Sequence, residues 1–323
     1  MKISAQQPIS ALKKYSKHKT HKKHTVKAAL LLTLAVFIQV KTAKAQLNPF
    51  SAMYYQNQYL SNPAMAGLEQ GLNVNMALRQ QWSSIPGSPK AQVVSGDYNA
   101  GKNVGLGLNV SNEQTGLIRQ TRAVATYAYH ILLGSNNQKL NFGLSAGVTN
   151  QRINYGDVNG DQGDMQVERY NNQNKAYLDG DFGVSYTSDK LTLQAALPNL
   201  NHFLKYSNAL LGVDRSLFLA SASYKFRLEN LLDGSVIEPK VVFRNVEGYN
   251  NVFDAGLNFT LKSDILHFYS MYHSSQSESF GFGANINKSV QLMLFYTTET
   301  SPLKTYTNGE FEVGLKLHLY KEQ

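Results

Sequence analysis

Acidic and amide side chains gather in one glycine-containing segment, in which residues 157–163 read DVNGDQG and Glu168 follows. Oxygen ligands at positions 1, 3, 5 and 12 of a loop are how an EF-hand binds Ca²⁺. Position 6, however, is Gln162, where the sharp turn needs glycine, and no amphipathic helix flanks the segment. We therefore interpret Asp157 to Glu168 as a solvated loop rich in turns, and leave open whether it binds calcium.

The histidines and serines form no recognisable catalytic or metal-binding pattern. Five histidines follow residue 45 without metal-binding spacing: His130, His202, His267, His273 and His318. Ser145, His130 and Asn141 are the residue types of a hydrolase, but nothing in their spacing brings them together. Gly105-Leu106-Gly107 is not a phosphate loop, because no helix follows it. We assign no catalytic, cofactor-binding or metal-binding residue and expect a protein that is not an enzyme.

The surrounding sequence alternates apolar residues with polar or small ones, as β-strands with two different faces do. The alternation is clearest at 104–111, 140–149, 253–261, 280–286 and 311–319. In the last segment the apolar residues share one face, whereas Glu312, Lys316 and His318 share the other. Charged groups on one face of such a strand indicate a wet or polar barrel interior.

No apolar run after Ala45 is long enough for a membrane helix, so a membrane-spanning structure would have to be a closed sheet. The expected fold class is all-β, a transmembrane antiparallel β-barrel of about 14 strands, an even number as in bacterial single-chain barrels. The strands are expected to begin near Leu72, Ala91, Asn103, Gln120, Lys139, Tyr177, Lys190, Ser216, Ser235, Asn251, Ile265, Ser279, Ser289 and Gly309.

The connections between these segments differ in length. Those after even-numbered strands are mostly tight, as at 188–189, 262–264 and 287–288. Those after odd-numbered strands include the two longest, near 150–176 and 198–215. Short periplasmic turns that alternate with longer outer loops are typical of outer-membrane barrels. A soluble β-sandwich would share the alternation, but it would not readily explain this number of strands or the loop asymmetry.

The first 45 residues have the features of an export signal. They contain ten Lys and no Asp, Glu, Arg or Gly, and a mostly apolar run extends from Ala28 to Val40. This run is too short to span a membrane but suits a signal peptide, and Ala43-Lys44-Ala45 supplies a cleavage site. We expect residues 1–45 to be a cleaved signal peptide, 46–70 to be a periplasmic or lumen segment, and 71–323 to form the barrel.

Cleavage would change the net charge. The whole chain carries 31 Lys and Arg against 22 Asp and Glu, and without the ten lysines of the leader the balance is 21 against 22. We therefore expect no nucleic-acid partner, which is the other interpretation of a lysine-rich terminus. The chain has no cysteine, so a large hydrogen-bonded sheet must stabilise it instead of disulfides.

Two motifs near the start of the expected mature chain are specific. Residues 62–67 read NPAMAG, and residues 79–89 read RQQWSSIPGSP. They resemble the NPA-x-AG and R-x-QW-x-x-IPG-x-P signatures of the PorP/SprF family of Bacteroidota outer-membrane proteins. The similarity continues through 103–107, 127–130, 181–183 and 197–200 to the last strand. Leu319 replaces the usual closing aromatic residue, and Leu294–Thr298 stands where the family has G-Y-S-Y-D, which leaves the subgroup and the partner open.

This resemblance implies an accessory barrel of the type IX secretion system, associated in some relatives with gliding motility. Its implied location is the outer membrane. Its implied partners are the lipid bilayer, a secreted or surface protein with a C-terminal sorting domain, and periplasmic components of the secretion system. The alternative is a passive outer-membrane channel or small-solute transporter that uses the polar inner face. Pro86, Gly87 and Pro89 would either set a rigid turn or present a partner-docking loop.

Aromatic residues are numerous near the expected strand ends, as in the pairs Tyr127 and Tyr129, Tyr269 and Tyr272, and Phe295 and Tyr296. Such residues could form the aromatic girdles of a membrane barrel. Tyrosine also simply favours strands, and the number of aromatic residues does not separate the two interpretations.

Overall fold

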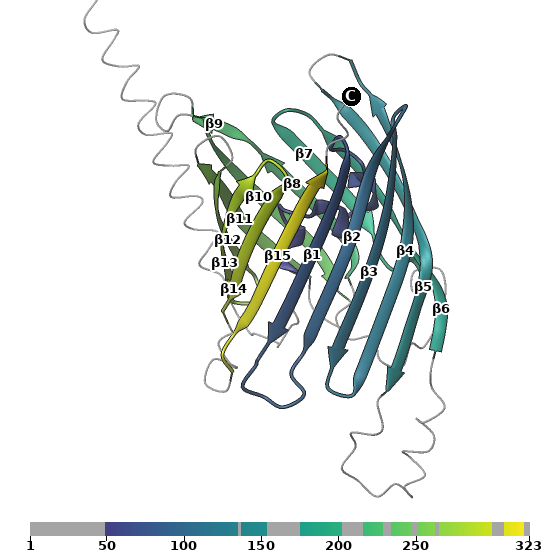
Figure 1. Cartoon of the computed structure of the whole chain (residues 1–323), viewed down its shortest axis with the longest axis vertical. Coiled ribbons are helices and arrows are strands. Elements are labelled where there is room, and N and C mark those ends of the chain that lie inside the picture. The colour runs from purple at the N-terminus through teal and green to yellow at the C-terminus, as the bar shows by residue number, and fades with distance from the viewer. Residues whose placement is uncertain are drawn as a thin grey trace, which may run out of the picture. The chain divides into compact units, whose positions relative to one another are not determined.

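The computed structural model describes residues 49–134, 137–153, 175–201, 216–228, 234–246, 251–261, 265–298 and 307–319. Most of these residues lie in one antiparallel sheet, preceded by three short 3-10 helices (Figure 1). The strands are β1 (Leu72–Gln81), β2 (Lys90–Gly101), β3 (Val104–Thr115), β4 (Ile118–Leu132), β5 (Lys139–Ile153), β6 (Lys175–Thr187), β7 (Leu191–Leu197), β8 (Ser216–Tyr224), β9 (Phe226–Leu228), β10 (Ser235–Val246), β11 (Val252–Leu261), β12 (Leu266–His273), β13 (Ser277–Asn287), β14 (Val290–Thr297) and β15 (Glu310–Leu319). The helices are η1 (Ser51–Met53), η2 (Gln58–Leu60) and η3 (Pro63–Met65).

The sheet closes on itself, because β15 pairs with β1 and β10 pairs with β11. Strands β8 and β9 both pair with β10 and are interrupted only at Lys225, so the 15 labelled strands form a barrel of 14. Each of the 14 predicted strand starts lies within two residues of an observed one. The prediction of a 14-stranded antiparallel barrel is confirmed, and the β-sandwich alternative is wrong.

The two faces of the sheet differ as the sequence pattern predicted. On β5, Leu144 points outward and is 55% exposed, whereas the next residue, Ser145, points inward and is 3% exposed. Most of the exposed large apolar side chains belong to the outward face of the strands. An outward apolar band around a polar interior is the arrangement that lipid requires of a membrane barrel.

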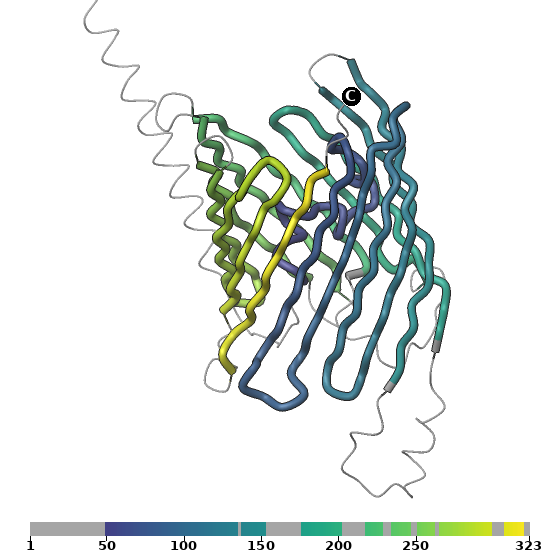
Figure 2. Tube along the Cα trace, viewed as in Figure 1, coloured from purple at the N-terminus to yellow at the C-terminus, as the bar shows by residue number. Residues whose placement is uncertain are grey.

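The two ends of the barrel differ in their connections, and we name them by this difference. The loop end carries the long connections between β5 and β6 and between β7 and β8, together with tight turns at 116–117 and 274–276. The turn end carries short connections such as 102–103, 188–190 and 288–289. The strands between them are unequal, since β4 and β5 each have 15 residues and β12 and β14 have 8 (Figure 2).

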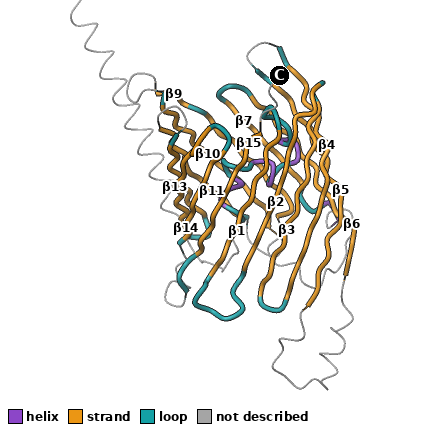
Figure 3. Tube along the Cα trace, in the orientation of Figure 1, coloured by secondary structure: helices purple, strands orange, loops and turns teal. Residues whose placement is uncertain are grey.

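Residues 49–71 do not join the sheet and instead lie inside the barrel, where we call them the plug. The helices η1, η2 and η3 are enclosed by the strands (Figure 3). Phe50 packs against Ala77, Ala91 and Val93 in the loop-end half of β1 and β2, and Gly67 hydrogen-bonds to the turn-end half of β2. The plug thus runs along the lumen from the loop end to the turn end, where β1 begins.

The aromatic residues do not all play the part of a girdle. Tyr127, Tyr129 and Tyr296 are 39% to 54% exposed on the outer face, as a girdle requires. Tyr269 and Phe295 are 3% and 5% exposed and point into the lumen, so the girdle interpretation is wrong for these two residues. They pack against the plug instead. Among the described residues, no helix is long and apolar enough to cross a membrane.

Candidate functional site

The first residues of the plug are bound by a buried carboxylate on β15. The backbone N–H groups of Ser51 and Ala52 donate to the two carboxylate oxygens of Glu312, at 2.7 and 2.8 Å. These are charge-assisted hydrogen bonds at the start of a 3-10 helix, whose first N–H groups have no partner within the helix. Beside them, the Arg79 guanidinium lies 4.8 Å from the centre of the Phe50 ring. Glu312 therefore attaches η1 to β15.

Tyr54 ties the plug to a buried polar network on β10, β11 and β12. Its hydroxyl donates to Asp254 at 2.7 Å, and Asp254 also accepts from Arg244 at 2.8 Å and lies 2.7 Å from Nδ1 of His273. The other ring nitrogen of His273 lies 2.8 Å from the Ser279 hydroxyl. All of these side chains are buried, so the Asp254 carboxylate needs all three partners to offset its lost hydration.

Tyr55, the residue after Tyr54, faces a buried lysine. Its hydroxyl donates to the Glu238 carbonyl at 3.0 Å, and the Lys240 ammonium lies 4.8 Å from the centre of its ring. Lys240 also donates to the carbonyl of Tyr54. Burial raises the pKa of Tyr55, so its phenol stays a neutral donor. Both tyrosines thus contact the wall through their rings and their hydroxyl groups.

An apolar cluster completes this side of the lumen. Its buried members come partly from the plug and partly from the strands. They are Ala52, Met53 and Tyr54 of the plug, and Leu219, Val242, Tyr269, Met271, Met293 and Phe295 of the strands. Tyr54 and Tyr269 stack with their centroids 6.3 Å apart, and Tyr269 meets Phe295 edge-on at 5.4 Å. We call the inner faces of β10, β11, β12, β14 and β15 the clamp wall, because large side chains there grip the plug.

The opposite wall holds the plug in another way. A Cβ added to Gly143 of β5 would lie 2.2 Å from the Pro63 carbonyl carbon, and one added to Gly183 of β6 would lie 2.0 Å from Oδ1 of Asn62. One added to Gly105 of β3 would lie 2.0 Å from the Ala66 carbonyl oxygen. These distances are far shorter than any real contact. We call the inner faces of β3, β5 and β6 the glycine wall, because the missing side chains let the plug lie directly on the sheet. The plug backbone does so at Gly105 and Gly143, and the Asn62 side chain does so at Gly183.

Hydrogen bonds fix the NPAMAG segment in this position. The Asn62 side chain accepts from the Ala64 N–H at 2.9 Å and donates to the Val184 carbonyl at 3.2 Å, so it caps η3 and attaches it to β6. At the end of the segment, the Gly67 N–H donates to Asp97 at 3.0 Å. Gly67 has a φ of 69°, a conformation that glycine adopts without strain. The motif quoted from the sequence is therefore the part of the plug that contacts the glycine wall.

The hydrolase residues considered above are not assembled. The Nδ1 atom of His130 lies 2.9 Å from Oδ1 of Asn141, and its Nε2 atom lies 3.1 Å from the Ala66 carbonyl oxygen. The Ser145 hydroxyl lies 2.7 Å from that of Thr126, which lies 2.7 Å from that of Tyr59. Ser145 therefore does not hydrogen-bond to His130. Both groups attach the plug to β4 and β5 rather than forming a nucleophile and its base.

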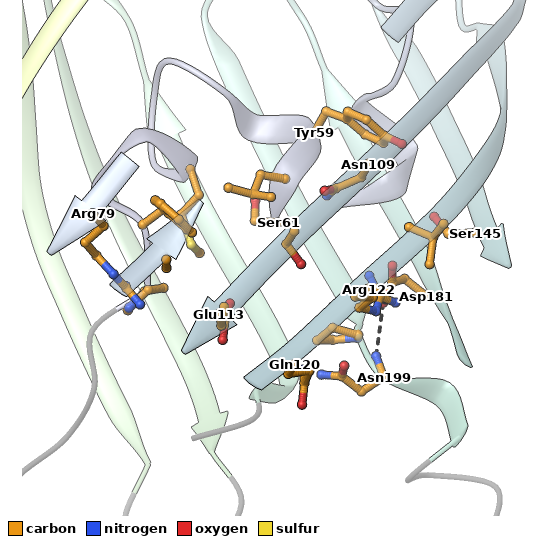
Figure 4. Close-up of a pocket in the computed structure, with 18 of the residues that line it drawn as sticks. Tyr59, Ser61, Arg79, Asn109, Glu113, Gln120, Arg122, Ser145, Asp181 and Asn199 are labelled. Carbon is orange, nitrogen blue, oxygen red and sulfur yellow. Dashed lines mark hydrogen bonds and ion pairs between the residues drawn. The ribbon is translucent and has the colours of Figure 1, made fainter. Parts of the chain in front are cut away.

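Between the plug and the loop end lies a cavity of about 350 Å³. Its lining mixes apolar plug residues with charged and amide groups from the strands, and Figure 4 labels ten of these residues: Tyr59, Ser61, Arg79, Asn109, Glu113, Gln120, Arg122, Ser145, Asp181 and Asn199. Arg122 is paired with Asp179 at 3.1 Å and Asp181 at 2.8 Å. A second cavity, of about 600 Å³, lies toward the turn end, where Glu69, Lys225 and Lys316 help to line it. The plug contributes lining residues to both.

The second sequence motif forms the connection between β1 and β2 at the loop end. Within it the Ile85 N–H donates to the Trp82 carbonyl at 2.8 Å, and the Gly116 N–H of the next turn donates to the Gly87 carbonyl at 3.0 Å. Residues 83–87 are exposed, whereas Ser88 and Pro89 are buried. The motif thus sets a turn and also presents an exposed tip, which is compatible with both interpretations given above.

The remaining segments singled out in the sequence lie partly outside the described residues. The segment from Asp157 to Glu168 lies outside the described residues, as does the expected signal peptide. Among the described residues, no group of three or more His, Cys, Asp or Glu side chains could hold a metal ion. Residues 197–200 end β7 and fold back, so that the Asn199 N–H donates to Asp181 at 3.0 Å.

The sequence reasoning did not identify the contacts between plug and wall. The inward glycines were recognised as small positions, but no partner was assigned to them. Their repetition at Gly105, Gly107, Gly143 and Gly183 on inward-facing positions was a usable signal, because glycine weakens a strand and often marks a place where another part of the chain comes close. Glu312, in contrast, offered no signal of its own.

Known proteins resemble this chain to different extents. No curated protein matches the chain. Among solved structures, it resembles the outer-membrane protein Omp33 of Acinetobacter baumannii, with 8% identity and a TM-score of 0.46 over 78% of this chain and 100% of that one. It also resembles the toluene transporter TbuX of Ralstonia pickettii, with 12% identity and a TM-score of 0.48 over 87% and 96%. The family described as type IX secretion system membrane protein PorP/SprF matches residues 43–317, and the chain belongs to that family.

Proposed function

We propose that this protein is an accessory component of the type IX secretion system that does no catalysis and assists the secretion or surface attachment of a partner protein. The partner would carry a C-terminal sorting domain, and periplasmic components of the system would bind at the turn end. A role in gliding motility belongs to the same proposal. The family membership and the outer-membrane barrel support it.

The observation that carries the proposal is the filled lumen. The plug is hydrogen-bonded to β2, β4, β6, β11 and β15 and packed against the clamp wall and the glycine wall. A passive channel needs a continuous water-filled path, and a segment fixed to both walls obstructs one. The loop-end cavity is lined by both apolar and polar groups, which suits contact with a polypeptide.

The proposal includes the processing of the chain. Residues 1–45 would be removed as a signal peptide, and residues 46–70 would then be the lumen segment of the mature protein. The loop end would face the outside, as it does in barrels with short periplasmic turns. The exposed tip of the β1–β2 connection would contribute to partner contact there.

Two measurements test the function. The purified protein in a planar bilayer is expected to show no steady conductance, and deletion of its gene is expected to remove a particular protein from the medium or cell surface while outer-membrane permeability stays unchanged. Steady single-channel conductance of the intact protein, with the exported proteins unaffected by deletion, would identify a transporter and end the accessory proposal. Cleavage of lipids or esters by the purified protein would overturn its non-enzymatic part.

A further inference from the structure

The barrel wall formed by β2 to β5 continues past the apolar band at the loop end. Its last fully apolar row on the outer face runs through cross-strand neighbours on five adjacent strands: Val94, Val110, Ala123, Val148 and Leu178. Four of these side chains are large and exposed, and Leu178 is 75% exposed. This row marks where the lipid-facing surface of β2 to β5 ends, because the next outward residues on these four strands are polar.

Two further rows follow on the same outer face. The first contains the cross-strand neighbours Gln92, Asn112, Thr121 and Asn150, in which the Thr121 hydroxyl donates to Asn112 at 3.1 Å. The second contains Lys90, Gln114, Arg119 and Arg152. Their outward direction follows from the strand alternation, since the flanking residues Glu113, Ile118, Gln120 and Gln151 line the loop-end cavity inside.

The second row brings two positive charges together. Arg119 of β4 and Arg152 of β5 are directly opposite each other in the register. Like charges in this position destabilise a sheet unless something neutralises them. Among the described residues, no ion pair forms with either arginine, and the buried Nε of Arg119 has no hydrogen-bond partner. The acidic residue of β3 at this level, Glu113, faces the lumen cavity.

The opposite side of the barrel lacks this feature. On β13, β14 and β15 the corresponding outward row is aromatic and consists of Phe280, Tyr296 and Phe311. Tyr296 and Phe311 have their ring centres 5.0 Å apart, and β14 ends one residue after Tyr296. Aromatic rings at this level are typical of the membrane interface. The arginine pair therefore belongs to the taller wall alone.

We propose that Arg119 and Arg152 bind the phosphate of an anionic lipid headgroup in the leaflet at the loop end. The arginine row lies two pleats beyond the last apolar row, roughly 13 Å along tilted strands. A strand tilt of about 40° reduces this to roughly 10 Å along the membrane normal, and the apolar surface ends about midway, so the arginines lie roughly 5 Å beyond it. That places them within the headgroup layer, which is about 5–7 Å thick on each side of the hydrocarbon core. Guanidinium groups bind phosphate through paired hydrogen bonds, and the amides beside them add neutral donors.

The test is the binding of bisphosphorylated lipid A to the purified full chain in detergent, measured by native mass spectrometry. Each cation near an anionic membrane surface contributes about fivefold, so Arg119→Gln with Arg152→Gln is expected to weaken binding by about 25-fold. Arg119→Lys with Arg152→Lys keeps both charges and should retain most of the affinity. Heat-dependent migration on gels checks that each variant is folded.

The matched control removes two positive charges at the other end of the barrel, Arg227→Gln with Lys288→Gln, and should leave lipid A binding unchanged. Both of these side chains are exposed. Equal losses in the control and the test variant, or no loss in either, would overturn the proposal. Displacement of lipid A by excess inorganic phosphate would assign the pair to a free anion, which would also overturn it.

Discussion

The clamp wall and the glycine wall hold the same 23-residue plug by opposite means. On the clamp wall, Glu312, Asp254 and the aromatic cluster reach toward the plug with long side chains. On the glycine wall, the absence of side chains lets the plug backbone approach the sheet at Gly105 and Gly143 and lets the Asn62 side chain approach it at Gly183. One wall attracts the plug, and the other makes room for it.

This difference predicts how substitutions in the two walls should affect the binding of the plug. A contact that depends on attraction weakens gradually when one partner is removed, because neighbouring contacts remain. A contact that depends on empty space fails abruptly, because a single methyl group meets backbone atoms that cannot move aside. The glycine wall should therefore be the less tolerant of the two, although it contributes fewer polar interactions.

The largest effect is expected from Gly143→Ala. The new Cβ would lie 2.2 Å from the Pro63 carbonyl carbon and 2.3 Å from the Ala64 nitrogen. Overpacking commonly costs about 1–3 kcal/mol, and a collision between two backbones should reach at least the upper end of that range. We expect the plug to leave its seat, which limited proteolysis would detect as new cleavage within residues 49–71.

The control for this variant is Gly96→Ala on β2. The nearest atom to its added Cβ is the Asn73 carbonyl oxygen at 3.8 Å, which is an ordinary contact. This variant should show the wild-type cleavage pattern and a urea midpoint that is equal or slightly higher, because alanine restricts the unfolded chain. If Gly143→Ala behaved like Gly96→Ala, the glycine wall would not be a steric requirement.

The next effect in size is expected from Glu312→Ala on the clamp wall. The change leaves the buried N–H groups of Ser51 and Ala52 without an acceptor, at a cost of about 1–3 kcal/mol for each unsatisfied group. Hydrogen exchange should accelerate at the first residues of the plug while the NPAMAG segment stays protected. Glu278→Gln on the exposed outer face is the control. If the first plug residues exchanged equally fast in this variant, Glu312 would have no specific role in holding them.

A smaller effect compares a clamp-wall contact with a contact to β4 by one identical change. Tyr54→Phe removes a hydrogen bond to the carboxylate of Asp254, whereas Tyr59→Phe removes one to the Thr126 hydroxyl. Hydrogen bonds to charged groups contribute about 1.5–3 kcal/mol and neutral ones about 0.5–1.5 kcal/mol. Tyr54→Phe should therefore lower the free energy of unfolding more, and urea titrations of the two variants would show the reverse order if the clamp network were unimportant.

Much of this architecture was predictable from the sequence, since alternation along a strand directly reports its two faces. The inward placement of Ser145 and Glu312 and the outward placement of Leu144 and Phe311 follow from that period alone. Strand starts were also predictable, because the polar and glycine-rich turns interrupt the alternation. The girdle interpretation was wrong for Tyr269 and Phe295, which lie on the inward face of their strands and pack against a plug more than 200 residues earlier in the sequence.

The contacts of the plug were not predictable for a related physical reason. Glu312 is one inward polar residue among many, and only the folded chain shows that its carboxylate meets Ser51 and Ala52. The NPAMAG motif was recognised, but its meaning lies in the absence of side chains at Gly143 and Gly183 on distant strands. Contacts between residues so far apart in sequence leave no periodic pattern in the local sequence from which they could be predicted.

The smallest effect concerns the turn end, where neither wall grips the plug tightly. Glu69 lies 2.8 Å from the Lys316 ammonium, and its side chain is 54% exposed. Burial acts to raise the pKa of Glu69, but the charge and hydrogen bond of Lys316 outweigh it, so the pKa is lowered from its ordinary 4.5. A lowered pKa in the folded state means that the ionised group stabilises the fold above pH 4.5 and that this contribution is lost as the pH falls through the folded-state value.

Glu69→Gln is therefore expected to lower the urea midpoint slightly at pH 7 and to match the wild type at a pH well below 4.5. The exposure of the pair and its screening by salt keep the effect small, so it should also shrink in concentrated salt at pH 7. Glu113→Gln at the loop end removes an exposed carboxylate that contacts the cavity instead of Lys316 and serves as the control. A difference between Glu69→Gln and the wild type that persisted in acid would show that Glu69 acts through packing, and the plug would then be held at its turn end by shape, as it is on the glycine wall.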